Sequence, residues 1–276
     1  MVKYGSFGLS LRGATHVKND LPNQDYFESY VSDDESFAVI AVCDGHGSEK
    51  YIRSDIGSKI AAEQATILMK EFLENHSQLK TESNMEDDIK RLERNILFYW
   101  REKVSEYTEK NPLTDEEYNA IKTKKNLQTA KDVRENNILA YGSTLIAIGL
   151  TQEYILCIQI GDGDITLLTE KGEKINPMHN DKRLIANETT SLCGDMAIHD
   201  FRNYFSYDLP IAVTACTDGI ANSYIMWEDF LQLTKDIHDE ITEKGEEKTL
   251  HLLDEGLNRL SINGSGDDVT LAIIYR

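Results

Sequence analysis

The stretch that most constrains the fold is an uninterrupted apolar run, Phe37–Cys43, which ends abruptly in Asp-Gly-His-Gly. An apolar run without polar alternation is typical of a strand buried on both faces. A helical pattern follows directly, with Ile52, Ile56 and Ile60 at four-residue spacing. A carboxylate and an imidazole therefore lie at the mouth of a buried strand, where they are costly unless they meet a partner or a metal. The simpler alternative is a tight turn in which Asp44 caps the helix.

Aspartates recur at the ends of other predicted strands, in most cases beside a glycine. The apolar runs Tyr154–Ile160 and Ile211–Thr217 each lead into such a pair, and another pair precedes the last run, Val269–Tyr275. A single Asp-Gly pair is a turn, but several on buried strands look like oxygen ligands that converge on a hard divalent cation such as Mg²⁺ or Mn²⁺. The aspartates concerned are Asp25, Asp44, Asp162, Asp218 and Asp267.

Six short motifs occur in the order found in the PP2C (PPM) metal-dependent protein phosphatases, and the chain resembles that family from about Gly5 to Tyr275. Each motif alone is weak evidence, whereas six in order at suitable spacing are strong evidence. The motifs are NQD at 23–25, DGHGS at 44–48, GST at 142–144, GDG at 161–163, DGI at 218–220 and GDDVT at 266–270.

The resemblance implies the fold class α+β, as a four-layer α-β-β-α sandwich of two antiparallel sheets flanked by helices. The length of 276 residues suits a single domain over 1–276. A polar stretch near 112–138, with a capping box at Thr114, is expected to be a solvated helical insertion. Apolar periodicity predicts helices over 48–74, 85–109, 226–241 and 246–261, and the stretch 177–208 is expected to be irregular.

The resemblance also implies the chemistry, which is hydrolysis of phosphoserine and phosphothreonine by water activated at a binuclear Mn²⁺/Mg²⁺ centre. Asp44 would bridge both metals, and the carbonyl oxygen of Gly45 would complete the shell of one of them. Asp218 and Asp267 would hold the other metal, and Asp25 would bind a metal or order its waters.

A general acid and a third metal are implied as well. His46 would protonate the leaving alkoxide, since the ordinary pKa of histidine lies near neutrality; a purely structural role is the alternative. The third site would use Asp162, Asp218 and Asn222. The family leads us to expect an acidic residue where Asn222 stands, so we expect two occupied metal sites and a weak third, which Asp164 could supplement.

The phosphate-binding arginine of the family is missing, because the position five residues before the aspartate of the NQD motif is Asp20. His16, Lys18 and Arg12, on a basic turn, are candidates to replace it, and so is Arg53 on the first helix. Ordinary surface charge is the alternative for the basic turn, and an ion pair with a nearby carboxylate is the alternative for Arg53.

The charge balance limits the partners. With 48 acidic and 29 basic residues, the net charge is −19, which disfavours binding to nucleic acid or anionic membranes. The sequence shows neither a signal region nor an apolar run of about 18 residues. The four cysteines lack metal-like spacing and suit a reducing cytoplasm. We therefore expect a cytoplasmic enzyme that acts on phosphorylated proteins; a non-catalytic, phosphatase-like binding module is the alternative.

Overall fold

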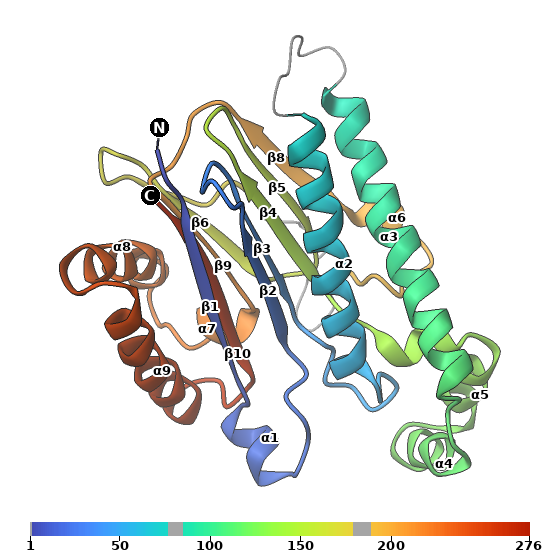
Figure 1. Ribbon diagram of the computed structural model, residues 1–276. Coiled ribbons are helices and arrows are strands. Elements are labelled where there is room, and N and C mark those ends of the chain that lie inside the picture. The colour runs from blue at the N-terminus through green and yellow to red at the C-terminus, as the bar shows by residue number, and fades with distance from the viewer. Residues whose placement is uncertain (1, 77–84, 179–188) are drawn as a thin grey trace.

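The computed structural model describes residues 2–76, 85–178 and 189–276 and contains two five-stranded antiparallel sheets packed face to face (Figure 1). From edge to edge, the first sheet consists of β1 (Gly5–Leu11), β10 (Val269–Tyr275), β9 (Ala212–Cys216), β6 (Asp164–Leu168) and β7 (Lys174–Ile175). The second consists of β2 (Tyr26–Val31), β3 (Ala38–Cys43), β4 (Leu145–Leu150), β5 (Ile155–Ile160) and β8 (Arg202–Ser206).

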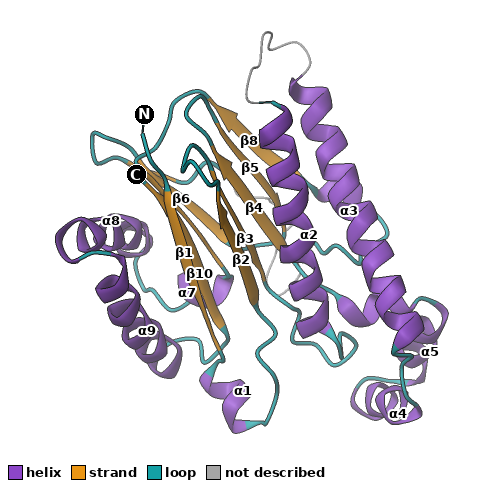
Figure 2. Cartoon of the chain, in the orientation of Figure 1, coloured by secondary structure: helices purple, strands orange, loops and turns teal. Residues whose placement is uncertain are grey.

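Long helices cover the outer face of each sheet, which confirms the predicted four-layer sandwich (Figure 2). The helices α2 (Ser54–Asn75) and α3 (Met85–Lys110) lie on the second sheet, and α8 (Trp227–Lys244) and α9 (Glu246–Asn263) lie on the first. The short helices are α1 (Ala14–Lys18), α4 (Asp115–Lys124), α5 (Leu127–Glu135), η2 (Asn137–Tyr141), α6 (Ala197–Asp200) and α7 (Asp218–Ala221). Across the described ranges, no helix is long and apolar enough to cross a lipid bilayer.

The position of β3 between two cores accounts for its uninterrupted apolar sequence. Successive side chains of a strand point to opposite faces. Val39 and Ala41 face the helices and join the core that surrounds the fully buried Trp100 of α3. Ile40 and Val42 face the other sheet, in a second core shared with β9 and β10. Both faces of β3 are therefore buried, as the sequence predicts.

A third core lies between the first sheet and the final helix pair. Phe230 and Ile237 of α8 and Leu257 of α9 pack there against Leu271 and Ile273 of β10. The three cores separate the four layers, so the loops at the strand ends project from a rigid support.

Two parts of the chain differ from the sequence-based prediction. The first long helix begins at Ser54 rather than at position 48, because residues 48–53 form turns instead. The stretch 177–208, expected to be irregular, contains α6 and the edge strand β8, while its residues 179–188 lie outside the described ranges. The insertion near 112–138 consists of α4, α5 and the start of η2.

Candidate active site

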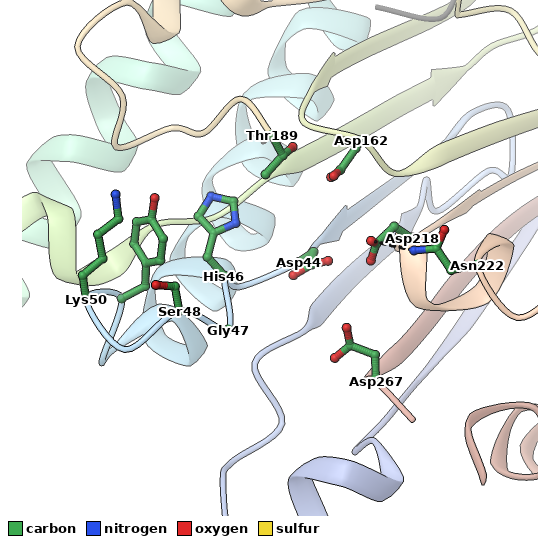
Figure 3. Close-up of a pocket in the computed structure, with 11 residues that line it drawn as sticks. Asp44, His46, Gly47, Ser48, Lys50, Asp162, Thr189, Asp218, Asn222 and Asp267 are labelled. Carbon is green, nitrogen blue, oxygen red and sulfur yellow. Dashed lines mark hydrogen bonds between the residues drawn. The ribbon is translucent and has the colours of Figure 1, made fainter. Parts of the chain in front are cut away.

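A pocket of about 940 Å³ opens at the end of the sandwich where β3, β5 and β9 stop (Figure 3). Four of the five predicted aspartates line it, and each comes from the end of a different strand. The described residues that line the pocket are Asp44, His46, Gly47, Ser48, Lys50, Tyr51, Asp162, Thr189, Asp218, Asn222 and Asp267.

Asp44 is fixed by the neighbouring strand. Its backbone N–H donates to Thr144 Oγ1 at 3.0 Å, and the N–H of Thr144 donates to the carbonyl oxygen of Asp44 at 2.9 Å. Burial and the charges of Asp25 and Asp218 raise the pKa of Asp44 well above its usual range. Carboxylates crowded in this way repel one another unless a proton or a cation lies between them.

Asp218 and Asp25 are connected through a hydrogen bond of Thr217. Asp218 begins α7, and Nδ2 of Asn222 donates to its Oδ2 at 2.9 Å. The preceding residue, Thr217, donates from Oγ1 to Oδ2 of Asp25 at 2.8 Å. Asp25 is buried behind the pocket instead of lining it, and burial followed by the charge of Asp268 raises its pKa well above the usual range.

Asp268 is a structural residue that the sequence reasoning missed. Its carboxylate accepts from the backbone N–H groups of Gly13 at 2.6 Å and Gln24 at 2.7 Å. His16 Nδ1 lies 2.8 Å from the same carboxylate, and both side chains are buried. Asp268 thus ties the first and last strands together and leaves its neighbour Asp267 directed into the pocket.

His16, a candidate for phosphate binding, is not among the described lining residues, and its ring lies against Asp268 instead. Lys18 is exposed on α1 and is not among the described lining residues. Arg12 donates to the carbonyl oxygen of His16 at 3.2 Å and lies 3.5 Å from Asp20. The basic turn consequently contributes to the first loop rather than to the pocket.

Arg53, the other candidate for phosphate binding, is not among the described lining residues either. Its guanidinium donates twice to the carboxylate of Glu117 on α4, at 2.7 and 2.9 Å, and once to the hydroxyl of Tyr141 at 2.8 Å. It reaches the carbonyl oxygens of Asn111 and Pro112 as well. Arg53 thus forms an ion pair with Glu117 of the insertion, instead of with Asp55 or Glu49 on its own segment.

Gly45 is required by the close approach of two other backbone segments. A Cβ at this position would collide with the carbonyl oxygens of Gln24 and Ser54. Its own N–H donates to the Gln24 carbonyl oxygen at 3.1 Å, and the Gln24 side chain donates to Ser54 Oγ at 2.7 Å. The loop that follows β3 is thereby anchored beside the NQD motif.

His46 is part of this loop, and its backbone N–H donates to the carbonyl oxygen of Gly142 at 3.1 Å. Its ring packs on that of Tyr51 with a centroid separation of 4.6 Å. In the described part of the chain, Nε2 is buried without a hydrogen-bond partner. Burial, assisted by the charge of Lys50, lowers the pKa of His46 to about 4, so the ring is neutral near pH 7.

The loop Gly161–Asp164 supplies the residues expected at a third metal site. Asp162 lines the pocket, whereas Asp164, at the start of β6, is not among the described lining residues. Burial, followed by the charges of Asp218 and Asp162, raises the pKa of Asp164 to about 7. The charges of the aspartate cluster therefore act on Asp164, although it is not among the described residues that line the pocket.

Lys50, Tyr51 and Thr189 line the pocket but are not among the site residues predicted from the sequence. The first two lie in a segment predicted to be helical. They were placed within a helix that in fact begins only at Ser54. The polar and glycine-containing sequence around Ser48 was the available signal that this segment is a loop.

The donor set suits a hard cation in its chemistry. The pocket offers carboxylate oxygens from several strand ends, and burial with mutual repulsion raises the pKa of Asp44 and of Asp218. Within the described ranges, no group of three or more His, Cys, Asp or Glu side chains stands in an arrangement that could hold a metal ion. Metal binding would therefore have to draw the carboxylates together.

Comparison with known families gives a match over most of the chain. Residues 12–255 match the family described as protein phosphatase 2C. A sequence search of the curated proteins found no match.

Solved structures share the fold at low sequence identity. The serine/threonine phosphatase Stp1 from Staphylococcus aureus has a TM-score of 0.59 at 11% identity, covering 100% of this chain and 96% of that one. PppA of Pseudomonas aeruginosa, described as a regulatory component of a secretion system, has a TM-score of 0.57 at 15% identity, covering 99% and 98%. The catalytic domain of the phosphatase PstP, solved with two manganese ions, has a TM-score of 0.51 at 16% identity, covering 99% and 97%.

Proposed function

The chain belongs to the protein phosphatase 2C family, and we propose that it hydrolyses phosphoserine and phosphothreonine in proteins with two bound Mn²⁺ or Mg²⁺ ions. The observation that carries this proposal is the convergence of Asp44, Asp162, Asp218 and Asp267 on one pocket from four separate strand ends. The manganese pair of PstP, a structure with the same fold, supports the choice of cation.

The aspartates would hold the metals in the roles that the family suggests. Asp44 would bind both ions, and the carbonyl oxygen of Gly45 would complete the shell of one of them. Asp218 and Asp267 would hold the other ion, and Asp25 would bind a metal or order its waters. When bound, such ions polarise the phosphoryl group and lower the pKa of water, which supplies a nucleophile at neutral pH. The protein contributes the fixed backbone around Asp44 and the hydrogen bonds that orient Asp218 and Asp25.

His46 would contribute as the proton donor to the leaving oxygen. Its buried Nε2 has no hydrogen-bond partner in the described structure, so no protein group competes for this nitrogen. Lys50 on the same loop adds positive charge to an otherwise acidic pocket, which favours the entry of a phosphate.

The third metal site would bind its cation with low affinity. Asp162 and Asp218 bring charge to it, but Asn222 brings only an amide, whose nitrogen already donates to Asp218. The ion-binding oxygen of the amide carries no full charge, so a hard cation binds there less tightly.

The alternative function is a phosphatase-like module that binds phosphoproteins without turnover. The loss of the family's arginine at the Asp20 position favours it, whereas the retained aspartates favour catalysis. The four buried, unpaired cysteines suit a reducing compartment, in keeping with the proposed cytoplasmic location.

Phosphate release from a phosphoserine peptide and from p-nitrophenyl phosphate, with and without Mn²⁺, tests the proposal. We expect Mn²⁺-dependent release on both substrates. Asp44→Ala and Asp218→Ala should each lower kcat/KM by more than about 100-fold, since even changes around metal ligands cost about 10–100-fold. Asp87→Ala, an exposed carboxylate on α3, is the matched control and should keep full activity.

Near-normal turnover in Asp44→Ala or Asp218→Ala would overturn the two-metal proposal. Absence of turnover by the unaltered protein, together with retained phosphopeptide binding, would instead establish the binding module.

A further inference from the structure

The pocket has two chemically different sides. Figure 3 shows Asp44, Asp218 and Asp267 toward one side, and His46 and then Lys50 toward the other. The ring of Tyr51 contacts both members of the second group, with its centroid 4.6 Å from that of His46 and 4.4 Å from Nζ of Lys50. A phosphoryl group at the aspartates would therefore leave Lys50 facing another part of the same substrate.

Lys50 is the one Lys or Arg among the described residues that line the pocket. No ion pair holds its ammonium in the described part of the chain, although neighbouring lysines are paired. Lys125 lies 3.2 Å from Glu49, and Lys59 lies 3.9 Å from Glu63. The Lys50 charge acts within the protein, because it helps to lower the pKa of buried His46.

The segment that carries Lys50 is fixed on both sides. The carboxylate of Glu49 meets Lys125, and Arg53 is clamped by Glu117 and Tyr141. The Tyr51 N–H donates to the carbonyl oxygen of Ser48 at 2.8 Å. A cation on a preorganised loop loses less entropy when it binds an anion than one on a mobile loop does.

We propose that Lys50 and Tyr51 form a substrate subsite for a second anionic group, a carboxylate or a further phosphate, borne by a residue close to the phosphorylated one. Lys50 attracts the charge, and the ring of Tyr51 covers the apolar stem that carries it. In a protein with a net charge of −19, acidic substrates are repelled overall, so a local cation decides whether they are accepted. The subsite rests on the proposed phosphatase function and narrows its substrate class to acidic phosphoproteins.

A set of phosphoserine peptides tests the subsite. One Asp is moved through the positions flanking the phosphoserine, and each peptide is paired with its Asn counterpart. At low ionic strength and in Mn²⁺, the unaltered protein should show a kcat/KM ratio of Asp to Asn of about 3–5 for at least one position, as expected for a single partly exposed ion pair. A phosphonate at the preferred position then shows whether a carboxylate or a second phosphate fits better.

Lys50→Met should bring this ratio to about 1 or below, and Lys50→Arg should retain it. Lys248→Met, which removes an exposed cation on α9 outside the pocket, is the matched control and should leave the ratio unchanged. The subsite is overturned if no position shows a preference that depends on Lys50.

Binding separates this result from failure of the phosphatase function. If the protein releases no phosphate, fluorescence anisotropy of the same labelled peptides in the same Mn²⁺ buffer measures the Asp-to-Asn preference directly. A preference that Lys50→Met removes would support the subsite in a binding module. Equal binding of Asp and Asn peptides to the unaltered protein would overturn the subsite in either case.

Discussion

At the scale of single residues, the protonation of His46 determines what this side chain can contribute to catalysis. Burial keeps the ring neutral near pH 7 in the free protein, with a pKa of about 4. A dianionic phosphoryl group beside the ring favours its charged form and raises that pKa. Substrate binding is thus what would prepare His46 to donate a proton.

His46→Gln should therefore distinguish leaving groups. Turnover of a phosphoserine peptide should fall by about 100-fold, since positioned acids contribute at least this much. Turnover of p-nitrophenyl phosphate should fall far less, because p-nitrophenolate leaves without a proton. The measurement is kcat on both substrates.

His199→Gln makes the same replacement at an exposed position and should leave both rates unchanged. Equal losses on the two substrates in His46→Gln would show that His46 has a structural role.

The site residues were predictable only where the local sequence shows that a charged side chain must be buried, which is costly without a partner. An aspartate after a buried strand needs a partner wherever the strand lies, so Asp44 and Asp218 could be found. The contacts of Arg53 and Asp268 could not be predicted, because their partners Glu117 and Gly13 lie 64 and 255 positions away in the sequence. Sequence spacing does not reveal which of several charges meet in three dimensions.

At the scale of elements, the insertion α4–α5 holds the loop that lines the pocket. Glu117 of α4 lies in a capping box with Thr114, and its carboxylate also accepts two hydrogen bonds from Arg53. Lys125, just after α4, meets Glu49 on the same loop. The insertion therefore supports the loop of Lys50 and Tyr51 from outside.

Arg53→Met should destabilise the protein by about 2–3 kcal/mol, because it leaves the largely buried Glu117 carboxylate without its charged donor. In a double-mutant cycle with Glu117→Gln, the coupling energy should be about 1–2 kcal/mol. Urea denaturation gives both values.

Lys103→Met, which breaks an exposed ion pair with Glu106 on α3, is the control and should change stability by less than about 0.5 kcal/mol. Additive effects of the Arg53 and Glu117 substitutions would show that the contact does not couple the insertion to the loop.

Elements were predictable where periodicity is strong. The Leu and Ile positions of α3 and α9 repeat on one face, and β3 is apolar throughout. The edge strand β8 escaped prediction because its residues are only partly buried or exposed, which leaves no alternating pattern. The polar α4 is recognisable from its capping box at Thr114 rather than from an apolar stripe, whereas the cap of α5 at Asn126 was not predicted.

At the scale of the whole molecule, the aspartate cluster makes stability depend on cations and on pH. Burial and mutual repulsion raise the pKa of Asp25, Asp44 and Asp218, and that of Asp164 to about 7. The stability contributed by such groups is complete below their unfolded pKa of about 3.9 and is lost as the pH rises through the folded value. Without metal, the fold is thus weakened near neutral pH.

Mn²⁺ should raise Tm by at least about 5 °C at pH 7.5, since saturation of a site to about 100 times its Kd contributes about 2.7 kcal/mol. At pH 5.5 the shift should be smaller, because protons then compete with the ion for the carboxylates. Thermal unfolding with Mn²⁺ or with a chelator measures both shifts.

In Asp44→Ala the Mn²⁺ shift should largely disappear, while the Tm without metal at pH 7.5 should rise, because one buried negative charge is gone. Asp87→Ala should behave like the unaltered protein. An equal Mn²⁺ shift in Asp44→Ala and in the unaltered protein would argue against the pocket as the metal site.

The pairing of β1 with β10 also determines when the site can form during protein synthesis. Thr270 Oγ1 donates to Ser10 Oγ at 2.8 Å across 260 positions, and His16 meets Asp268 beside it. A ribosome needs roughly 10–50 s to make that much chain at about 5–20 residues per second. Asp44 is translated 223 positions before Asp267. The aspartate cluster is therefore incomplete on a nascent chain until β10 has been made and has paired with β1.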